Sequence, residues 1–291
     1  MKRRLLAGRM SILYAVALLF LASPATAQKV DIIADVVYGH KDGMALTFDV
    51  LKPADANGAA VMYMVSGGWV SAWSDPERMV TRFSGLLDHG ITLFIVRHGS
   101  SPRYFVPEAV ADVRRAARFI QQNAALWGVD PDRLGAHGGS AGGHLSLMLG
   151  IGTDTGDPEA SEPFMREPVR LASVVAYYPP VDLRTWARGR MPDAPADQRF
   201  PALNFDRDLA AGISPILFVS PDDPPTLLIH GTADATVPLD HSIRIHNAFE
   251  QVGVETDLII IDGAGHGFTG EDAVRANAAM VDWFVRTLTP D

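Results

Sequence analysis

The stretch Leu134-Gly-Ala-His-Gly-Gly-Ser-Ala-Gly-Gly-His-Leu145 decides the fold. It holds a G-x-S-x-G pattern centred on Ser140, between an apolar run typical of a strand and a run typical of a helix. A serine in this setting lies on a tight turn, where the strand and the helix approach each other and the residues two positions before and after the serine must be small. Gly138 and Gly142 meet this requirement. The pattern is common in glycine-rich chains, and it is the strand-turn-helix setting that predicts a nucleophilic serine.

A serine hydroxyl is a weak nucleophile at neutral pH and needs a histidine base, which in turn needs an orienting carboxylate. On a strand-turn-helix serine the chain order is Ser, Asp or Glu, then His. Asp234 follows the apolar run 226–230, and His266 follows the apolar run 258–261 between two glycines. We therefore predict Ser140, Asp234 and His266 as the catalytic residues, with Asp262, four residues before His266, as the rival carboxylate.

Four of the other histidines are interpreted as packing or surface residues: His144, His230, His241 and His246. The chain has no cysteine and no H-E-x-x-H motif, so neither a cysteine nucleophile nor a metal mechanism has support in the sequence. We expect no cofactor and no metal.

A serine mechanism also needs backbone N–H groups that stabilise the oxyanion of the tetrahedral intermediate. Ala141, directly after the nucleophile, supplies one, and a glycine-rich turn after an early strand supplies the other. The turn Ser66-Gly67-Gly68-Trp69 follows an apolar run and offers Gly67 and Gly68, with Trp69 as a candidate substrate contact. A plain structural turn is the alternative.

Outward from these motifs, short apolar runs alternate with helical stretches. Residues 30–37 and 45–51 predict an antiparallel strand pair around a turn at Lys41-Asp42-Gly43. Later strands are predicted at 59–65, 91–96, 134–137, 172–177, 226–230 and 258–261, and helices at 76–88, 107–127, 141–149, 240–252 and 272–287. Continuous apolar runs favour an α/β fold, a mostly parallel sheet with helices on both faces. Segments 152–168 and 185–214 fit neither element and are candidate lids or surface insertions.

The 291 residues, 47% hydrophobic and 20% charged, are typical of a folded globular protein. Residues 1–27 combine a basic start, a short apolar stretch and Ala25-Thr26-Ala27, which predicts a cleavable export signal rather than a membrane anchor. Its removal takes away four basic residues and lowers the net charge from −9 to −13. We expect an exported, periplasmic or secreted protein with one catalytic domain over 28–291, no nucleic-acid partner and no stable membrane anchor.

Together these motifs resemble the α/β-hydrolase esterases, in particular the hormone-sensitive-lipase-like carboxylesterases and the bacterial feruloyl or acetyl-xylan esterase branch. The resemblance covers nearly the whole mature chain, including segments 128–133, 139–145, 224–231 and 263–268. It implies the α/β-hydrolase fold, the triad Ser140, Asp234 and His266, and an oxyanion hole of Gly67, Gly68 and Ala141. The chain departs from the family where Val65-Ser66 replaces His-Gly before the glycine turn, and where Arg97-His98 begins a segment that is usually Tyr-Arg-Leu.

The predicted function is hydrolysis of carboxylic esters through an acyl-enzyme. The resemblance implies small acylated carbohydrates or aryl esters as substrates. One alternative is a serine peptidase of the prolyl-oligopeptidase type. Such peptidases usually carry a large N-terminal propeller, and about 264 residues leave no room for one, so this chain would be a form without the propeller. The other is a non-catalytic binding protein on a hydrolase fold, which only the altered glycine turn favours.

Overall fold

The computed structural model describes residues 29–151, 154–186 and 195–289. Within these ranges the chain forms an eight-stranded sheet in the order β1-β2-β4-β3-β5-β6-β7-β8. The first two strand pairings, β1 with β2 and β2 with β4, are antiparallel, and all the others are parallel. The strands are β1 (Val30–Lys41), β2 (Met44–Pro53), β3 (Ala60–Met64), β4 (Thr92–Val96), β5 (Leu134–Gly139), β6 (Ser173–Tyr177), β7 (Thr226–Gly231) and β8 (Thr256–Ile261).

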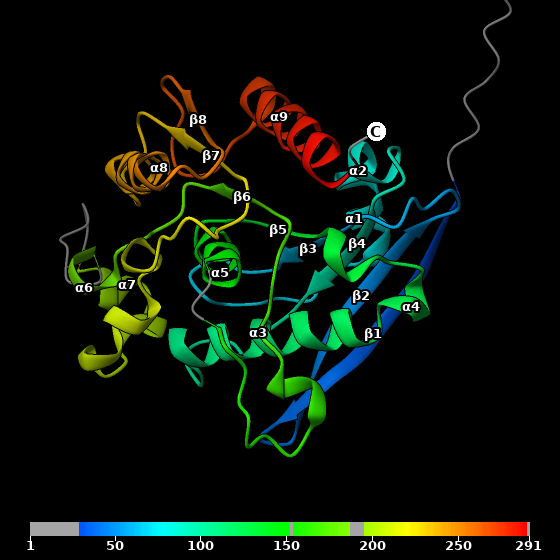
Figure 1. Cartoon of the computed structure of the whole chain (residues 1–291). Helices are drawn as coiled ribbons and strands as arrows, with labels where there is room; N and C mark the ends of the chain where they lie inside the picture. Colours follow the sequence, from blue (N-terminus) through cyan, green and yellow to red (C-terminus); the bar gives the residue numbers. More distant parts are fainter. Residues whose placement is uncertain (1–28, 152–153, 187–194, 290–291) are drawn as a thin grey trace, which may run out of the picture.

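Helices cover both faces of the sheet (Figure 1). They are α1 (Pro76–Arg82), α2 (Ser84–Leu87), α3 (Val106–Gln122), α4 (Ala124–Trp127), α5 (Ala141–Gly150), α6 (Leu183–Trp186), α7 (Ala196–Arg199), α8 (Asp240–Val252) and α9 (Gly270–Leu288). Short 3₁₀ helices lie at Pro131–Arg133, Pro163–Arg166, Pro201–Leu203, Arg207–Leu209, Ala211–Ile213 and Pro215–Leu217. The mostly parallel sheet with an antiparallel N-terminal pair confirms the predicted fold class.

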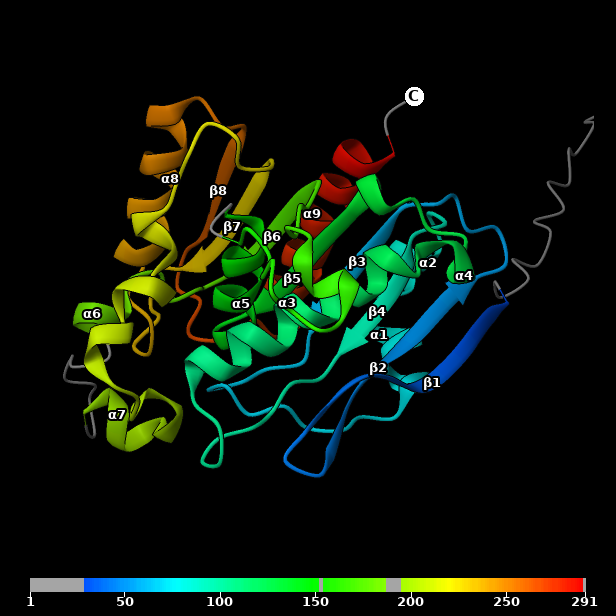
Figure 2. The ribbon, with the colours of Figure 1, turned by 60° about the horizontal axis from the view of Figure 1, so that its bottom comes forward.

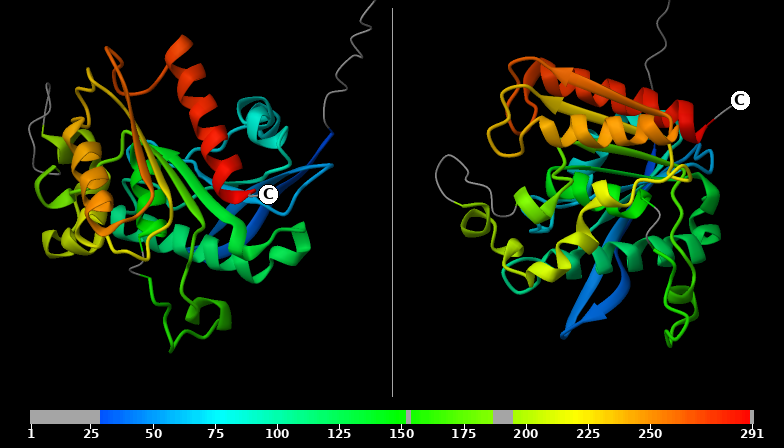
Figure 3. Two further views of the ribbon diagram at one scale, coloured as in Figure 1. Left: turned by 45° about the horizontal axis from the view of Figure 1, so that its top comes forward. Right: turned by 60° about the vertical axis from the view of Figure 1, so that its left-hand side comes forward.

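The apolar strands bury side chains on both faces. Val61 and Met62 are neighbours in β3 and are both fully buried, yet they belong to different core clusters, because successive side chains of a strand point to opposite faces. One cluster is completed by α3, α5 and α8, and the other by α1, α2 and α9. The left view of Figure 3 shows α9 and α3 on opposite sides of the strands.

Two predicted helices are interrupted. The helix expected over 76–88 divides at Phe83 into α1 and α2, and the helix expected over 107–127 divides at Asn123 into α3 and α4. Asn123 leaves helical geometry at φ −107° and ψ 14°, and its side-chain amide donates to the carbonyl of Phe119. A side chain that bonds to its own backbone in this way competes with the helical hydrogen bonds.

The hairpin between β1 and β2 turns at Asp42 and Gly43, where the sequence predicted it. Both residues have positive φ, 47° and 82°, as a two-residue turn that follows the twist of the strands requires. This pair lies at one edge of the sheet, and β8 with α8 lies at the other (Figure 2).

The two predicted lid segments differ in position. In the first, Arg118 of α3 pairs with Asp154 and donates to the carbonyl of Glu167, so the segment packs along α3. In the second, α7 and the residue after it, Phe200, reach the edge of the sheet where β3, β5, β7 and β8 end. The predicted signal at 1–27 lies outside the described residues. None of the helices in the described ranges is long and apolar enough to span a bilayer.

Candidate active site

Ser140 stands on the turn between β5 and α5 with φ 55° and ψ −120°. Such a conformation costs about 1–3 kcal/mol for a residue with a side chain, and the surrounding packing must impose it. A Cβ built on Gly138 would lie 2.4 Å from the carbonyl carbon of Gly142, and one on Gly142 would lie 2.8 Å from the carbonyl oxygen of Met64. Strand β5, helix α5 and the end of β3 therefore approach one another so closely at this turn that only glycine fits at positions 138 and 142.

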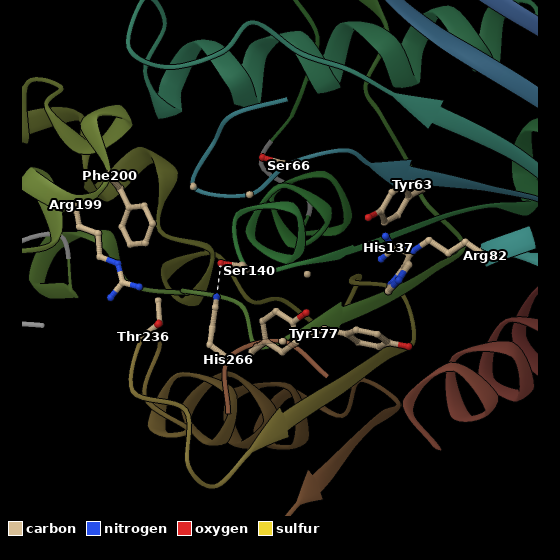
Figure 4. A pocket seen from close by; sticks show the side chains of 15 residues that line it. Tyr63, Ser66, Arg82, His137, Ser140, Tyr177, Arg199, Phe200, Thr236 and His266 are labelled. Carbon is tan, nitrogen blue, oxygen red and sulfur yellow. Dashed lines mark hydrogen bonds between the residues drawn. The ribbon is translucent and has the colours of Figure 1, made fainter. Parts of the chain in front are cut away.

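The structure brings the three predicted catalytic residues together from the ends of three strands. His266 Nε2 lies 2.9 Å from Ser140 Oγ (Figure 4). His266 Nδ1 lies 2.7 Å from Asp234 Oδ2. An ionised carboxylate only accepts, so Nδ1 carries the proton and the Nε2 lone pair faces the serine hydroxyl. This tautomer is the one in which the imidazole can take a proton from Ser140.

Asp234 is held by several donors and its side chain is fully buried. Its Oδ1 accepts from the backbone N–H groups of Thr236 (2.8 Å) and Val237 (2.9 Å). Burial alone would raise the pKa of Asp234, but hydrogen bonds from His230 and His266, the charge of His266 and the Val237 amide outweigh it and hold that pKa well below its usual value. The carboxylate is therefore ionised at neutral pH.

The sequence interpreted His230 as a packing residue, and the structure gives it a further contact. Its Nδ1 accepts from the Ser242 hydroxyl at 2.7 Å, so its Nε2 carries the proton and donates to the carbonyl of Val237 at 2.9 Å. The same Nε2 is 3.3 Å from Asp234 Oδ2. His230 thus helps to hold the Asp234 carboxylate in place. The sequence signal for this contact was the position of His230 near the end of β7, four residues before Asp234.

The rival carboxylate has a different partner. Asp262 is exposed and accepts from the hydroxyl of Thr232 at 3.0 Å, and no contact with His266 is found in the described chain. The geometry therefore favours Asp234 over Asp262 as the partner of the histidine.

Two backbone N–H groups are free to stabilise an oxyanion beside Ser140. Among the described residues, the amides of Gly68 and Ala141 have no acceptor, and Gly68 lines the cavity in front of the serine. The third predicted donor is engaged, because the Gly67 N–H donates to the carbonyl of Val70 at 3.1 Å. This bond closes the turn, and Gly68, at φ 57°, is left as the residue of the turn whose amide has no acceptor among the described residues.

The two departures from the family pattern contact each other. His98 is buried; its Nδ1 donates to the carbonyl of Gly99 at 2.7 Å, and its Nε2 lies 2.9 Å from Ser66 Oγ. Burial lowers the pKa of His98, so the ring is neutral and accepts from the Ser66 hydroxyl. This bond ties the glycine turn after β3 to the segment after β4, where the family's own histidine is missing.

Trp69 is not a substrate contact in this structure, and that prediction is corrected. Its side chain is 1% exposed and lies outside the cavity lining. The indole N–H donates to His144 Nδ1 at 3.3 Å, and His144 Nε2 donates to the carbonyl of Ile213 at 2.8 Å. Burial lowers the pKa of His144 to about 4, so this histidine is a neutral packing residue that joins the glycine turn to α5.

The cavity in front of Ser140 has a volume of about 340 Å³ and extends to two sides of the serine. Figure 4 shows Arg199, Phe200 and Thr236 on one side and Tyr63, Arg82, His137 and Tyr177 on the other. Phe200 presses on the glycine turn, since a Cβ built on Gly68 would lie 2.8 Å from its ring. No described residue of the first predicted lid, 154–168, lines this cavity.

No group of three or more His, Cys, Asp or Glu side chains that could hold a metal ion occurs in the described ranges.

The fold and the serine turn define an α/β-hydrolase, and comparison with known proteins gives the family. The chain matches the BD-FAE family model over residues 48–249, more than half of its length, and therefore belongs to that family. Residues 214–288 also match the model of the dienelactone hydrolase family. The predicted resemblance to α/β-hydrolase esterases is confirmed.

Among similar proteins, the probable carboxylic ester hydrolase LipM of Mycobacterium tuberculosis is 27% identical over 75% of this chain and 52% of its own length. An acetylxylan esterase of Xylanibacter ruminicola is 26% identical over 74% of this chain and 42% of its own length. The chain thus spans about half the length of these relatives. A truncated carbohydrate esterase from gut microbiota superposes with a TM-score of 0.72 at 26% identity, covering 91% of this chain and 99% of that structure.

Proposed function

We propose that the protein is a serine hydrolase that cleaves carboxylic esters through an acyl-enzyme. The observation that carries this proposal is the continuous hydrogen-bonded chain from Ser140 Oγ through His266 to Asp234, beside the free amides of Gly68 and Ala141. The names of the similar proteins, among them carboxylic ester hydrolases and an acetylxylan esterase, support the same chemistry.

In the first half-reaction Ser140 Oγ attacks the ester carbonyl while His266 Nε2 takes its proton. The oxyanion accepts hydrogen bonds from the amides of Gly68 and Ala141, each worth about 3 kcal/mol in the transition state. His266 then gives the proton to the leaving alcohol. Water, activated by the same imidazole, releases the acid from Ser140. Asp234 keeps the ring in the required tautomer and stabilises its charged form.

Small esters are the proposed substrates, with acylated carbohydrates and aryl esters as the candidate classes. A cavity of about 340 Å³ is within the range of small-molecule sites. Its aromatic and hydroxyl-bearing lining suits sugar and phenyl rings, which stack on aromatic side chains and bond to hydroxyl groups.

A panel of p-nitrophenyl esters of increasing acyl length, run beside an aminoacyl-prolyl amide, tests the proposal. The wild type should cleave the esters faster than the amide, and Ser140→Ala should lose this activity. Unchanged ester turnover in Ser140→Ala would exclude the nucleophile, and faster amide cleavage would favour a peptidase. Failure of a fluorophosphonate to label the folded protein at Ser140 would favour a non-catalytic binding protein.

We also propose export, on the pattern of residues 1–27. Mass spectrometry of the protein from a periplasmic or culture fraction of the expressing cells should find Gln28 at the N-terminus. An intact Met1 in the cytoplasmic fraction alone would contradict it.

A further inference from the structure

The cavity lining carries positive charge and no negative charge. Of the described residues that line it, Arg82 and Arg199 are arginines and none is Asp or Glu. The carboxylate of Asp234, which contacts His266, is fully buried and does not line the cavity. The whole chain has 34 acidic against 25 basic residues, so a cavity with two guanidinium groups differs in sign from the rest of the molecule. A concave site of one sign attracts ligands of the other.

Arg82 lies in the last turn of α1 and has no carboxylate partner in the described chain. Its guanidinium instead stacks over two aromatic rings, 4.9 Å from the centroid of Tyr63 and 5.3 Å from that of Phe83. These contacts hold the plane of the guanidinium and leave its N–H groups, which point outward from the edges, free for a ligand.

Two tyrosine hydroxyls beside this guanidinium are also unused. The hydroxyls of Tyr63 and Tyr178 line the cavity, and neither has a hydrogen-bond partner among the described residues. The Tyr178 ring lies 4.7 Å from the His266 ring, so these donors continue from the catalytic histidine toward Arg82.

His137 completes this side without adding charge. Its Nδ1 donates to the carbonyl of Val175 at 3.1 Å, and its ring lies 5.7 Å from Tyr63 and 4.6 Å from Tyr177. Burial lowers the pKa of His137 to about 3, so the ring is neutral. Arg82, an exposed residue that lies against the rings of Tyr63 and Phe83, is therefore the charged group on this side of the cavity.

We propose that this side of the cavity is a carboxylate subsite, and that the enzyme prefers esters that carry a carboxylate on the half bound beside Arg82. The carboxylate would accept from the Arg82 guanidinium and the Tyr63 hydroxyl while Ser140 attacks the ester carbonyl at the other end. Arg199, on the opposite side together with Thr236, contacts only the ring of Phe200 in the described chain and is not flanked by tyrosine hydroxyls as Arg82 is. This inference rests on the proposed ester hydrolysis and names its substrate class.

Matched ester pairs test the preference and show which half of the substrate lies beside Arg82. Mono-p-nitrophenyl adipate places the carboxylate in the acyl half, and its methyl ester is the neutral control. Para-acetoxybenzoate places it in the alcohol half, with methyl para-acetoxybenzoate as its control. In one of the two pairs the wild type should have a kcat/KM about tenfold or more higher for the charged ester, since a charge-assisted hydrogen bond contributes this much. Added salt should reduce that ratio.

Arg82→Gln should abolish the ratio, because kcat/KM for the charged ester falls to the value for its neutral control. Arg78→Gln is the matched control, because Arg78 is exposed on the same helix and does not line the cavity. Absence of a charged-ester preference in the wild type, or a ratio unaffected by Arg82→Gln, would overturn the proposal. So would a ratio lost in Arg199→Gln and retained in Arg82→Gln.

A binding measurement separates this inference from the proposed function. The amide that matches the preferred ester, N-phenyl adipamic acid for the adipate or para-acetamidobenzoate for para-acetoxybenzoate, carries the same carboxylate and is not turned over by an esterase. If its carboxylate occupies the subsite, it should raise the melting temperature of the wild type and of Ser140→Ala more than that of Arg82→Gln. Equal shifts in all three proteins would contradict the subsite. Loss of all ester turnover with the shifts intact would contradict only the esterase activity.

Discussion

Replacing Asp234 with asparagine tests how the carboxylate acts on the histidine. In the structure Oδ1 accepts from the amides of Thr236 and Val237 at 2.8 and 2.9 Å. Only an oxygen can take that position, so the new amide NH₂ must replace Oδ2, 2.7 Å from His266 Nδ1. His266 then has to accept at Nδ1, and its proton moves to Nε2, where it faces Ser140. The imidazole can no longer take the serine proton.

The expected loss in kcat is about 10⁴-fold, as for the corresponding change in other serine hydrolases, which equals about 5 kcal/mol of transition-state stabilisation. KM should change little, because Asp234 is buried and does not touch the substrate. Initial rates with p-nitrophenyl acetate measure both constants. Because the NH₂ would also face the Nε2–H of His230 at 3.3 Å, we expect a lower melting temperature as well.

Asp262→Asn is the matched control, since Asp262 is exposed and bonded to Thr232. It should keep its rate within about twofold of the wild type, as surface substitutions do. A loss below tenfold in Asp234→Asn, together with a large loss in Asp262→Asn, would refute the assignment of the carboxylate. A loss in Asp234→Asn accompanied by an unfolded circular dichroism spectrum would refute the tautomer explanation.

Two further predictions concern the histidines that position the site. Ser66→Ala should lower kcat about tenfold at unchanged KM, because the glycine turn loses its bond to His98 and the Gly68 amide is less well placed. Ser66→Thr keeps the hydroxyl and should restore kcat. Equal kcat values in the two variants would contradict the positioning role of Ser66. Burial lowers the pKa of His144 from 6.5 to about 4, so the unfolded state takes up the proton at a higher pH than the folded state does. The contribution of neutral His144 to the free energy of unfolding is therefore complete above about pH 6.5, and it falls by about 1.4 kcal/mol for each pH unit between about pH 6.5 and pH 4. Urea unfolding at several pH values should show a shallower pH dependence for His144→Gln than for the wild type, and parallel curves would contradict it.

The fold class and the serine turn were predictable because their signals are local. Strand and helix patterns depend on neighbouring residues, and a turn such as that at Ser140 imposes glycine at Gly138 and Gly142 through contacts within a few residues. The interruptions at Phe83 and Asn123 were missed for the opposite reason. Apolar periodicity continues through both residues, and only the packing of the helices onto the sheet decides where they break.

The sequence by itself supplied the candidate residues for the chemistry: Ser140 at a strand-to-helix turn, His266 with Asp234 or Asp262 as its partner, glycines before Trp69, and no cysteine. It favoured Asp234 over Asp262 as the partner of His266, but the contact itself depends on which loop faces His266 across the sheet edge, and that is seen only in the tertiary structure.

Only the tertiary structure paired Ser66 with His98, residues 32 positions apart, and buried the Trp69 side chain that the sequence offered to the substrate. It also placed Arg82 beside the Tyr63 ring at the cavity, without a carboxylate partner in the described chain. Contacts of this kind join segments that are distant in sequence, and no periodicity or motif spacing records them, since they are set by how parallel strands bring their carboxyl ends to one edge.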